Sequence, residues 1–211
     1  MKKSGRMNKM KGLITFFAAV ILILTVGSAN AEIVIDFESL GDLTVVDNQF
    51  LGLGADFNGL AKILSRSGSL AFTWPDPKSG YNVISDFSYD SSSSSIRDIR
   101  VDAVGPKWLM VGGYVTHGTY ITEKKNVTLT AYDSSGNILG FQSTNGSDTS
   151  GVANMLLSVS APNISYVIFS NEGLNTCTVD DFTFAPVPVP AAVLLGMLGL
   201  GVAGLKVRKF V

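Results

Sequence analysis

Short apolar or alternating runs, separated by Gly, Asn, Asp and Ser, recur through the middle of this 211-residue chain. The runs at 33–37, 165–170 and 177–184 have the length of β-strands, and residues 108–115 alternate between two faces. Helical periodicity is nearly absent, and only residues 58–65 suggest one or two helical turns. The pattern is typical of an all-β sandwich or barrel. We expect residues 32–186 to form a single β-sandwich domain.

The clearest local unit is a hairpin. Residues 127–132 and 138–141 read as two strands, and Asp133, Ser134, Ser135, Gly136 and Asn137 lie between them. Asp and Ser initiate tight turns, and Gly136 tolerates a positive φ. The spacing therefore predicts that the two strands pair with each other.

The N-terminal end carries an export pattern. Five basic residues precede Leu13, an apolar stretch runs from Leu13 to Val26, and Ala29 and Ala31 have the small-x-small spacing of a cleavage site. This predicts a signal peptide over residues 1–31 and export through the Sec translocon. An uncleaved N-terminal anchor is the alternative.

The C-terminal end is a second apolar segment. Val187, Pro188, Val189 and Pro190 precede an uncharged stretch from 191 to 205, and the basic residues that follow it are Lys206, Arg208 and Lys209. A helix from 187 to 205 would reach about 28 Å, close to the hydrocarbon thickness of a bilayer. The basic residues predict a cytoplasmic end, so residues 187–211 are expected to hold a transmembrane helix. A buried core helix is the alternative.

Charge is distributed unevenly along the chain. The region between the two ends has eight basic residues against 17 acidic ones, a net charge of −9. Such a surface argues against a nucleic-acid partner, which requires a basic patch.

Cys177 is the only cysteine, so an intramolecular disulfide is excluded, and we expect it to be a small core residue.

Pro188 and Pro190, the apolar stretch and the basic end together resemble the PEP-CTERM sorting signal of exported bacterial proteins, with Val189 in place of the usual glutamate. The resemblance implies recognition by an exosortase and a link to exopolysaccharide and biofilm in Gram-negative bacteria. The protein would be anchored in the membrane or released to the cell surface or matrix. Segments 35–38, 48–57, 131–140 and 179–184 also resemble, in their order, the galactose-binding-like jelly-roll domains that precede such tails.

In a jelly roll of that kind the first and last strands are neighbours, which would bring together four acids: Asp36, Glu38, Asp180 and Asp181. Carboxylate oxygens are ligands that Ca²⁺ prefers, and the resemblance to carbohydrate-binding jelly rolls implies a structural calcium near the joined ends. The alternative is that strand alternation points the acids to opposite faces, where they are solvated.

Sugar binding needs an exposed aromatic ring beside polar groups. Trp74 and Tyr81 are the best candidates for binding polysaccharide, although a structural role for Trp74 is also open. Trp108, Tyr114 and Tyr132 lie in strand-like runs and are expected in the core.

Enzymatic motifs are sparse. The single histidine, His117, is expected in a loop, and a Gly-x-Ser-x-Gly motif is absent from the chain. We therefore expect a non-enzymatic surface or matrix protein. A carbohydrate-binding module braced by calcium is the first alternative, and a glycan hydrolase or lyase that uses two carboxylates is the second.

Overall fold

The computed structural model describes residues 31–59, 61–68, 77–85, 98–117, 126–144, 154–171 and 177–188. Ala31–Val187 forms one compact unit. Among the described residues, no helix is long and apolar enough to cross a membrane. Residues 1–30 and 189–211 lie outside them, so most of the predicted signal peptide and tail is not described.

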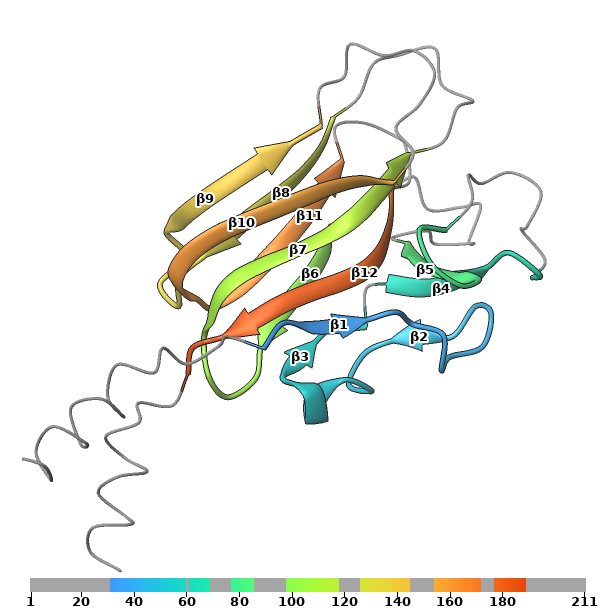
Figure 1. Cartoon of the computed structure of the whole chain (residues 1–211), viewed down its shortest axis with the longest axis horizontal. Helices are drawn as coiled ribbons and strands as arrows, with labels where there is room; N and C mark the ends of the chain where they lie inside the picture. The colour runs from blue at the N-terminus through green and yellow to red at the C-terminus, as the bar shows by residue number, and fades with distance from the viewer. Residues whose placement is uncertain are drawn as a thin grey trace, which may run out of the picture. The chain divides into compact units, whose positions relative to one another are not determined.

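The described strands form two antiparallel sheets (Figure 1). The larger sheet has the order β10 (Met155–Ile164), β7 (Trp108–His117), β12 (Cys177–Pro186), β5 (Asn82–Ser85), β4 (Ala61–Ser65) and β2 (Val45–Val46), and β1 (Ile33–Ile35) also pairs with β12. The smaller sheet has the order β3 (Ala55–Asp56), β6 (Ile99–Ala103), β11 (Tyr166–Asn171), β8 (Val127–Tyr132) and β9 (Ile138–Ser143). One short 3₁₀ helix, η1 (Leu51–Leu53), precedes β3. The prediction of an all-β sandwich is confirmed.

Aromatic side chains fill the core between the two sheets. Phe182 of β12 contacts Phe169 of β11 edge to face, with ring centroids 6.2 Å apart, and contacts Phe57 at 5.5 Å. Trp108 of β7 is fully buried against Phe184, with centroids 4.8 Å apart. The two edge-to-face contacts of Phe182 suit the quadrupoles of the rings, so they stabilise the sandwich beyond the burial of the rings alone. The prediction that Trp108 is a core residue is confirmed.

The predicted hairpin is also confirmed. β8 and β9 pair with Thr130 opposite Phe141, and Gly136 has φ 83° in the turn between them. The first and last strands are neighbours as expected, because Ile35 of β1 lies opposite Phe182 of β12.

Two local expectations were wrong. Residues 58–65 do not form a helix: Asn58 and Gly59 have positive φ angles, and β4 follows them. Ile63 of β4 is buried and lies opposite Ile84 of β5, so pairing with a distant strand outweighs the weak helical pattern. His117 is not a loop residue either; it is the last residue of β7 and its backbone lies opposite that of Cys177.

Candidate functional site

Three carboxylates, those of Glu38, Asp180 and Asp181, accept hydrogen bonds from the segment at the start of β5. The Ser79 N–H donates to Asp180 Oδ2 at 2.9 Å, and the Ser79 hydroxyl donates to Asp181 Oδ1 at 2.6 Å. The N–H groups of Tyr81 and Asn82 both donate to Glu38 Oε1, at 2.8 and 2.7 Å. We call residues 78–82 the anchored segment.

A β-bulge explains why two consecutive acids reach the same segment. Neighbouring side chains in a regular strand point to opposite faces. The register of β12 shifts between Asp180 and Thr183, and Asp181 adopts φ 45° there. The extra residue re-aims a side chain, which lets both carboxylates contact Ser79. The pairing of β1 with β12 brings Glu38, three residues after Ile35, to the same region.

Asp180 is the buried member of this group, with only 2% of its surface exposed. Burial raises the pKa of its carboxyl to about 6, although hydrogen bonds from the backbone of Ser79 and Asp181 act in the opposite direction. The carboxyl therefore changes its charge in a pH range where an exposed aspartate stays ionised.

The four acids predicted for calcium have different hydrogen-bond partners. Asp36 Oδ1 accepts the Glu38 N–H at 3.1 Å, while the other three acids accept hydrogen bonds from the anchored segment. Among the described residues, no group of three or more His, Cys, Asp or Glu side chains is placed to hold a metal ion. Calcium at these acids stays a prediction, and the function proposed below does not depend on it.

The anchored segment presents the exposed ring of Tyr81. This side chain is 62% exposed. Its backbone is fixed on both sides, because its N–H donates to Glu38 and its carbonyl accepts the Arg66 N–H at 2.8 Å. The next residue, Asn82, is buried and donates from its side chain to the carbonyls of Phe37 and Leu40 at 3.1 and 2.8 Å. The other aromatic candidate, Trp74, lies outside the described residues.

Sequence reasoning missed an aromatic row on the outer face of the smaller sheet. The rings of Tyr132 and Tyr166 stack with centroids 4.7 Å apart and planes 7° apart, and the Arg100 guanidinium lies 4.0 Å from the Tyr166 centroid. Arg100 also pairs with Asp102 at 2.7 Å. Because the rings cover one another's faces, this row is better suited to stabilising the sheet than to stacking a ligand.

The expectation that Tyr114 and Tyr132 lie in the core was wrong. Both are half-buried, and Lys78 of the anchored segment lies 4.8 Å from the ring centroid of Tyr114. The signal for Tyr132 was present in the alternation of β8, where Val127, Leu129 and Ala131 are buried and the residues between them are not.

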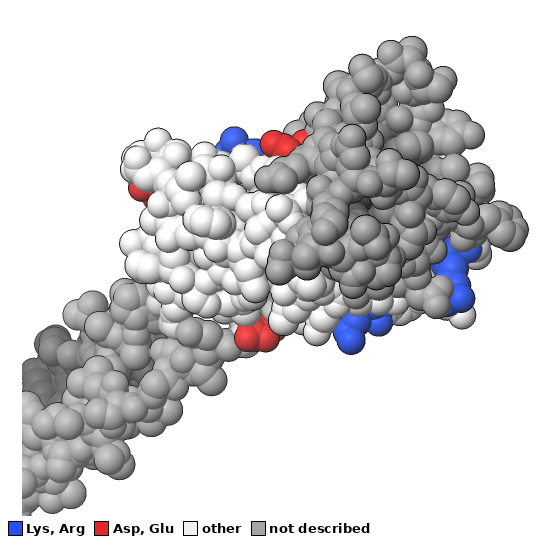
Figure 2. Space-filling model, turned by 90° about the horizontal axis from the view of Figure 1, so that it is seen from above, with Lys and Arg blue, Asp and Glu red and all other residues white. Residues whose placement is uncertain are grey.

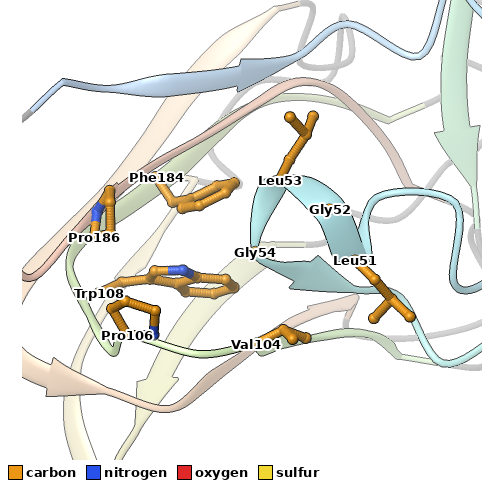
Figure 3. A pocket seen from close by; sticks show the side chains of 9 residues that line it. All are labelled: Leu51, Gly52, Leu53, Gly54, Val104, Pro106, Trp108, Phe184 and Pro186. Atoms are coloured by element: carbon orange, nitrogen blue, oxygen red, sulfur yellow. The ribbon is translucent and has the colours of Figure 1, made fainter.

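An apolar pocket of about 290 Å³ lies where the described chain leaves β12 (Figure 3). Trp108, Phe184 and Pro186 line one side of it, and the side chains of Leu51 and Leu53 come from η1. The backbone N–H of Val187, next to this pocket, donates to the Lys107 carbonyl at 2.7 Å. None of the lining side chains carries a carboxylate, imidazole, thiol or hydroxyl group, so the pocket offers shape and apolar contact rather than acid–base chemistry.

Figure 2 shows the distribution of charge on one face of the molecule. The charged side chains of the described residues lie at the margins of this view, and most of the described surface between them is uncharged. Contacts made on that part of the surface would therefore depend on apolar and neutral polar groups.

Several solved structures resemble this chain at low sequence identity. No protein-family model matches the chain, and no curated protein sequence matches it. The K2 cleaved adhesin domain of Lys-gingipain is 20% identical over 74% of this chain and 99% of that one, with a TM-score of 0.43. A DUF4465 family protein from Bacteroides caccae is 14% identical over 74% of this chain and 100% of that one, with a TM-score of 0.48.

A third similar structure holds the CBM22-1 and GH10 modules of an endo-1,4-β-D-xylanase from Clostridium thermocellum in complex with xylohexaose. It is 11% identical over 61% of this chain and 26% of that one, with a TM-score of 0.34. All three likenesses are too distant to assign a function to this chain.

Proposed function

We propose that this chain is an exported, non-catalytic β-sandwich protein that binds polysaccharide at the cell surface or in the extracellular matrix. The observation that carries the proposal is Tyr81, a 62% exposed ring on a backbone held at both its N–H and its carbonyl. The C–H faces of a sugar ring stack on aromatic rings, and polar neighbours bind the hydroxyl groups. A ring on a fixed backbone loses little conformational entropy on binding, which favours affinity.

Polar groups beside Tyr81 support the same function. Glu38 accepts the Tyr81 N–H through Oε1, and Lys78 and Ser79 belong to the same segment. Hydrogen bonds fix the segment itself, so these groups are placed before a ligand arrives. The carboxylates of Glu38, Asp180 and Asp181 hold this segment in place by hydrogen bonds. This role favours a ligand-binding function over a catalytic one.

The delivery of the domain is proposed from the two ends of the sequence. The signal-peptide pattern over residues 1–31 supports export through the Sec translocon, and the tail over 187–211 supports sorting by an exosortase through Pro188 and Pro190. In this proposal the sandwich is of the jelly-roll, galactose-binding-like type. It is held in the membrane of a Gram-negative bacterium by the tail or released into a polysaccharide matrix.

The test compares two exposed aromatic residues. Tyr81→Ala should weaken binding of the full chain to the exopolysaccharide of the producing cells by roughly tenfold, the equivalent of about 1.4 kcal/mol. Phe141→Ala is the matched control, because Phe141 is 70% exposed but lies in β9, away from the anchored segment, and it should leave binding unchanged. Affinity electrophoresis against a panel of neutral and acidic polysaccharides measures both. Equal binding by Tyr81→Ala and the wild type would refute the role of Tyr81.

A further inference from the structure

Exposed aliphatic side chains lie around the apolar pocket at the end of β12. Leu51 and Leu53 of η1 are 41% and 47% exposed, and Val104, which follows β6, is 37% exposed. Trp108 and Phe184 form the floor of the pocket and are buried. Figure 3 shows η1 beside the rings of both floor residues. We call Leu51, Leu53 and Val104 the apolar rim.

Backbone hydrogen bonds hold the two parts of the rim together. The Gly54 N–H donates to the Leu51 carbonyl at 3.0 Å, and Gly54 ends η1 with φ 100°. The Gly54 carbonyl accepts the Val104 N–H, also at 3.0 Å. A Cβ at position 54 would lie 3.4 Å from the Val104 carbonyl oxygen, so a glycine permits both the backbone angle and the close approach. The rim therefore presents its aliphatic side chains from one fixed place in the fold.

The segments that carry the rim contain no charged side chain, although the domain is acidic. Residues 50–55 and 104–106 are all uncharged, whereas the region between the two terminal segments has a net charge of −9. Exposed apolar side chains that lie together are typical of surfaces that contact another protein or a membrane. The rim is therefore suited to an apolar partner.

The course of the chain favours a membrane as this partner. β12 ends at Pro186, which lines the pocket, and the Val187 N–H donates to the Lys107 carbonyl at 2.7 Å. The uncharged stretch begins at Ala191, four residues after Val187, and four residues of extended chain span at most about 14 Å. The headgroup region on each side of a bilayer is roughly 5–8 Å thick. A tail that spans the membrane would therefore keep Val187 close to the lipid headgroups.

We propose that the apolar rim lies in the surface of the bilayer that holds the C-terminal tail, where Leu51 and Leu53 contact the acyl chains of phospholipids. This inference rests on the proposed attachment of the chain to the membrane through residues 187–211. Aliphatic side chains are stabilised when they leave water and enter the boundary between headgroups and acyl chains. The contact would fix which end of the sandwich faces the membrane.

The test places a fluorophore on the rim of the full chain in phospholipid vesicles. In a Cys177→Ser background, Leu51→Cys carries the dye nitrobenzoxadiazole, and the vesicles contain phosphatidylcholine with a doxyl spin label near the start of one acyl chain. The dye at position 51 is expected to lose most of its emission, because the spin label quenches fluorophores that lie among the lipids.

Met155→Cys with the same dye is the matched control. Met155 is 40% exposed, against 41% for Leu51, so both dyes replace aliphatic side chains of equal exposure. Met155 lies opposite Val115, seven residues along β7 from Trp108, which places it about 23 Å along the strand from the floor of the pocket. The dye at position 155 should keep its emission.

A second variant tests the chemistry of the contact. Leu53→Asp should restore the emission of the dye at position 51, because a carboxylate on the rim opposes its transfer into lipid. Met155→Asp should leave the quenching at position 51 unchanged. A dye at position 51 that is quenched equally with and without Leu53→Asp would overturn the proposal.

Flotation of the vesicles on a density gradient separates the failure of this inference from the failure of the proposed attachment. A chain that floats with the vesicles, but whose dye is quenched equally or not at all at positions 51 and 155, would overturn the contact of the rim and leave the attachment intact. That result is also expected if a second copy or another protein covers the rim. A chain that does not float would overturn both the attachment and the contact.

Discussion

Asp180 carries the main electrostatic consequence of the fold at the scale of single residues. Its carboxyl has a pKa of about 6 in the folded chain because burial disfavours the charged form, against 3.8 for an ordinary aspartate. Between pH 3.8 and about 6, the Asp180 carboxyl therefore keeps its proton in the folded state, whereas it has lost this proton in the unfolded state. The protonated carboxyl contributes its full stabilisation below pH 3.8, and this stabilisation is lost as the pH rises through about 6.

We predict that Asp180→Asn flattens the pH dependence of the free energy of unfolding between pH 5 and 7.5. In the wild type, this group makes the folded state less stable at pH 7.5 than at pH 5, whereas an asparagine does not ionise. Urea unfolding of both proteins at the two pH values measures the difference.

Asp133→Asn is the control for this experiment. Hydrogen bonds from the side chain and backbone of Asn137 lower the pKa of Asp133 below its ordinary 3.8, so this group is ionised at both pH values. Its replacement should leave the slope between pH 5 and 7.5 unchanged. An unchanged slope in Asp180→Asn would contradict the assignment of the titration to Asp180.

At the scale of elements, the β8–β9 hairpin shows how far a local pattern determines structure. The Asp133 N–H donates to the Asn137 carbonyl at 3.0 Å, and the Gly136 N–H donates to the Asp133 carbonyl at 3.2 Å. These contacts are all within five residues, so Asp133 and Gly136 predicted the turn directly. The 58–65 segment differs because its partner, β5, lies about 20 residues further along the chain, where a local pattern carries no information.

We predict that Gly136→Ala lowers the free energy of unfolding by about 1–2 kcal/mol, because a residue with a Cβ is strained at φ 83°. Gly52→Ala is the matched control: a Cβ at Gly52 would meet nothing within 4 Å, and the change should stay within about 0.5 kcal/mol. Urea unfolding midpoints compare the two variants. Equal losses in both would show that the turn is not the cause.

At the scale of the whole molecule, the basic residues at the two ends of the chain predict on which side of the membrane the β-sandwich lies. Five basic residues precede the first apolar stretch, and Lys206, Arg208 and Lys209 follow the second. Both sets are predicted to stay on the cytoplasmic side, which places the region between them outside.

We predict that a protease added to intact spheroplasts digests the β-sandwich of the full chain, because export places it outside the inner membrane. Immunoblotting against the domain measures its loss, and a cytoplasmic protein that survives serves as the control. A chain that lacks residues 187–211 should move from the membrane fraction to the soluble exported fraction. Protection of the domain in intact spheroplasts would contradict the proposed topology.

The sequence alone determined that the central region is all-β, where the hairpin turns, and that Trp108 lies in the core. These features depend on alternation along a strand and on turn residues a few positions apart, which are local properties of the chain. The alternation of apolar and polar residues in β8 would also have predicted that Tyr132 lies on the outer face of the sheet.

Only the tertiary structure decided the role of the acids and the position of β9 at the end of the smaller sheet. Asp180 and Ser79 are 101 residues apart in the sequence, and they meet because β12 pairs with β5 and because a bulge turns Asp180 and Asp181 toward the same segment. Whether a strand ends a sheet depends on the order of all the strands. Strand order and bulges arise from contacts between distant segments, which no local pattern specifies.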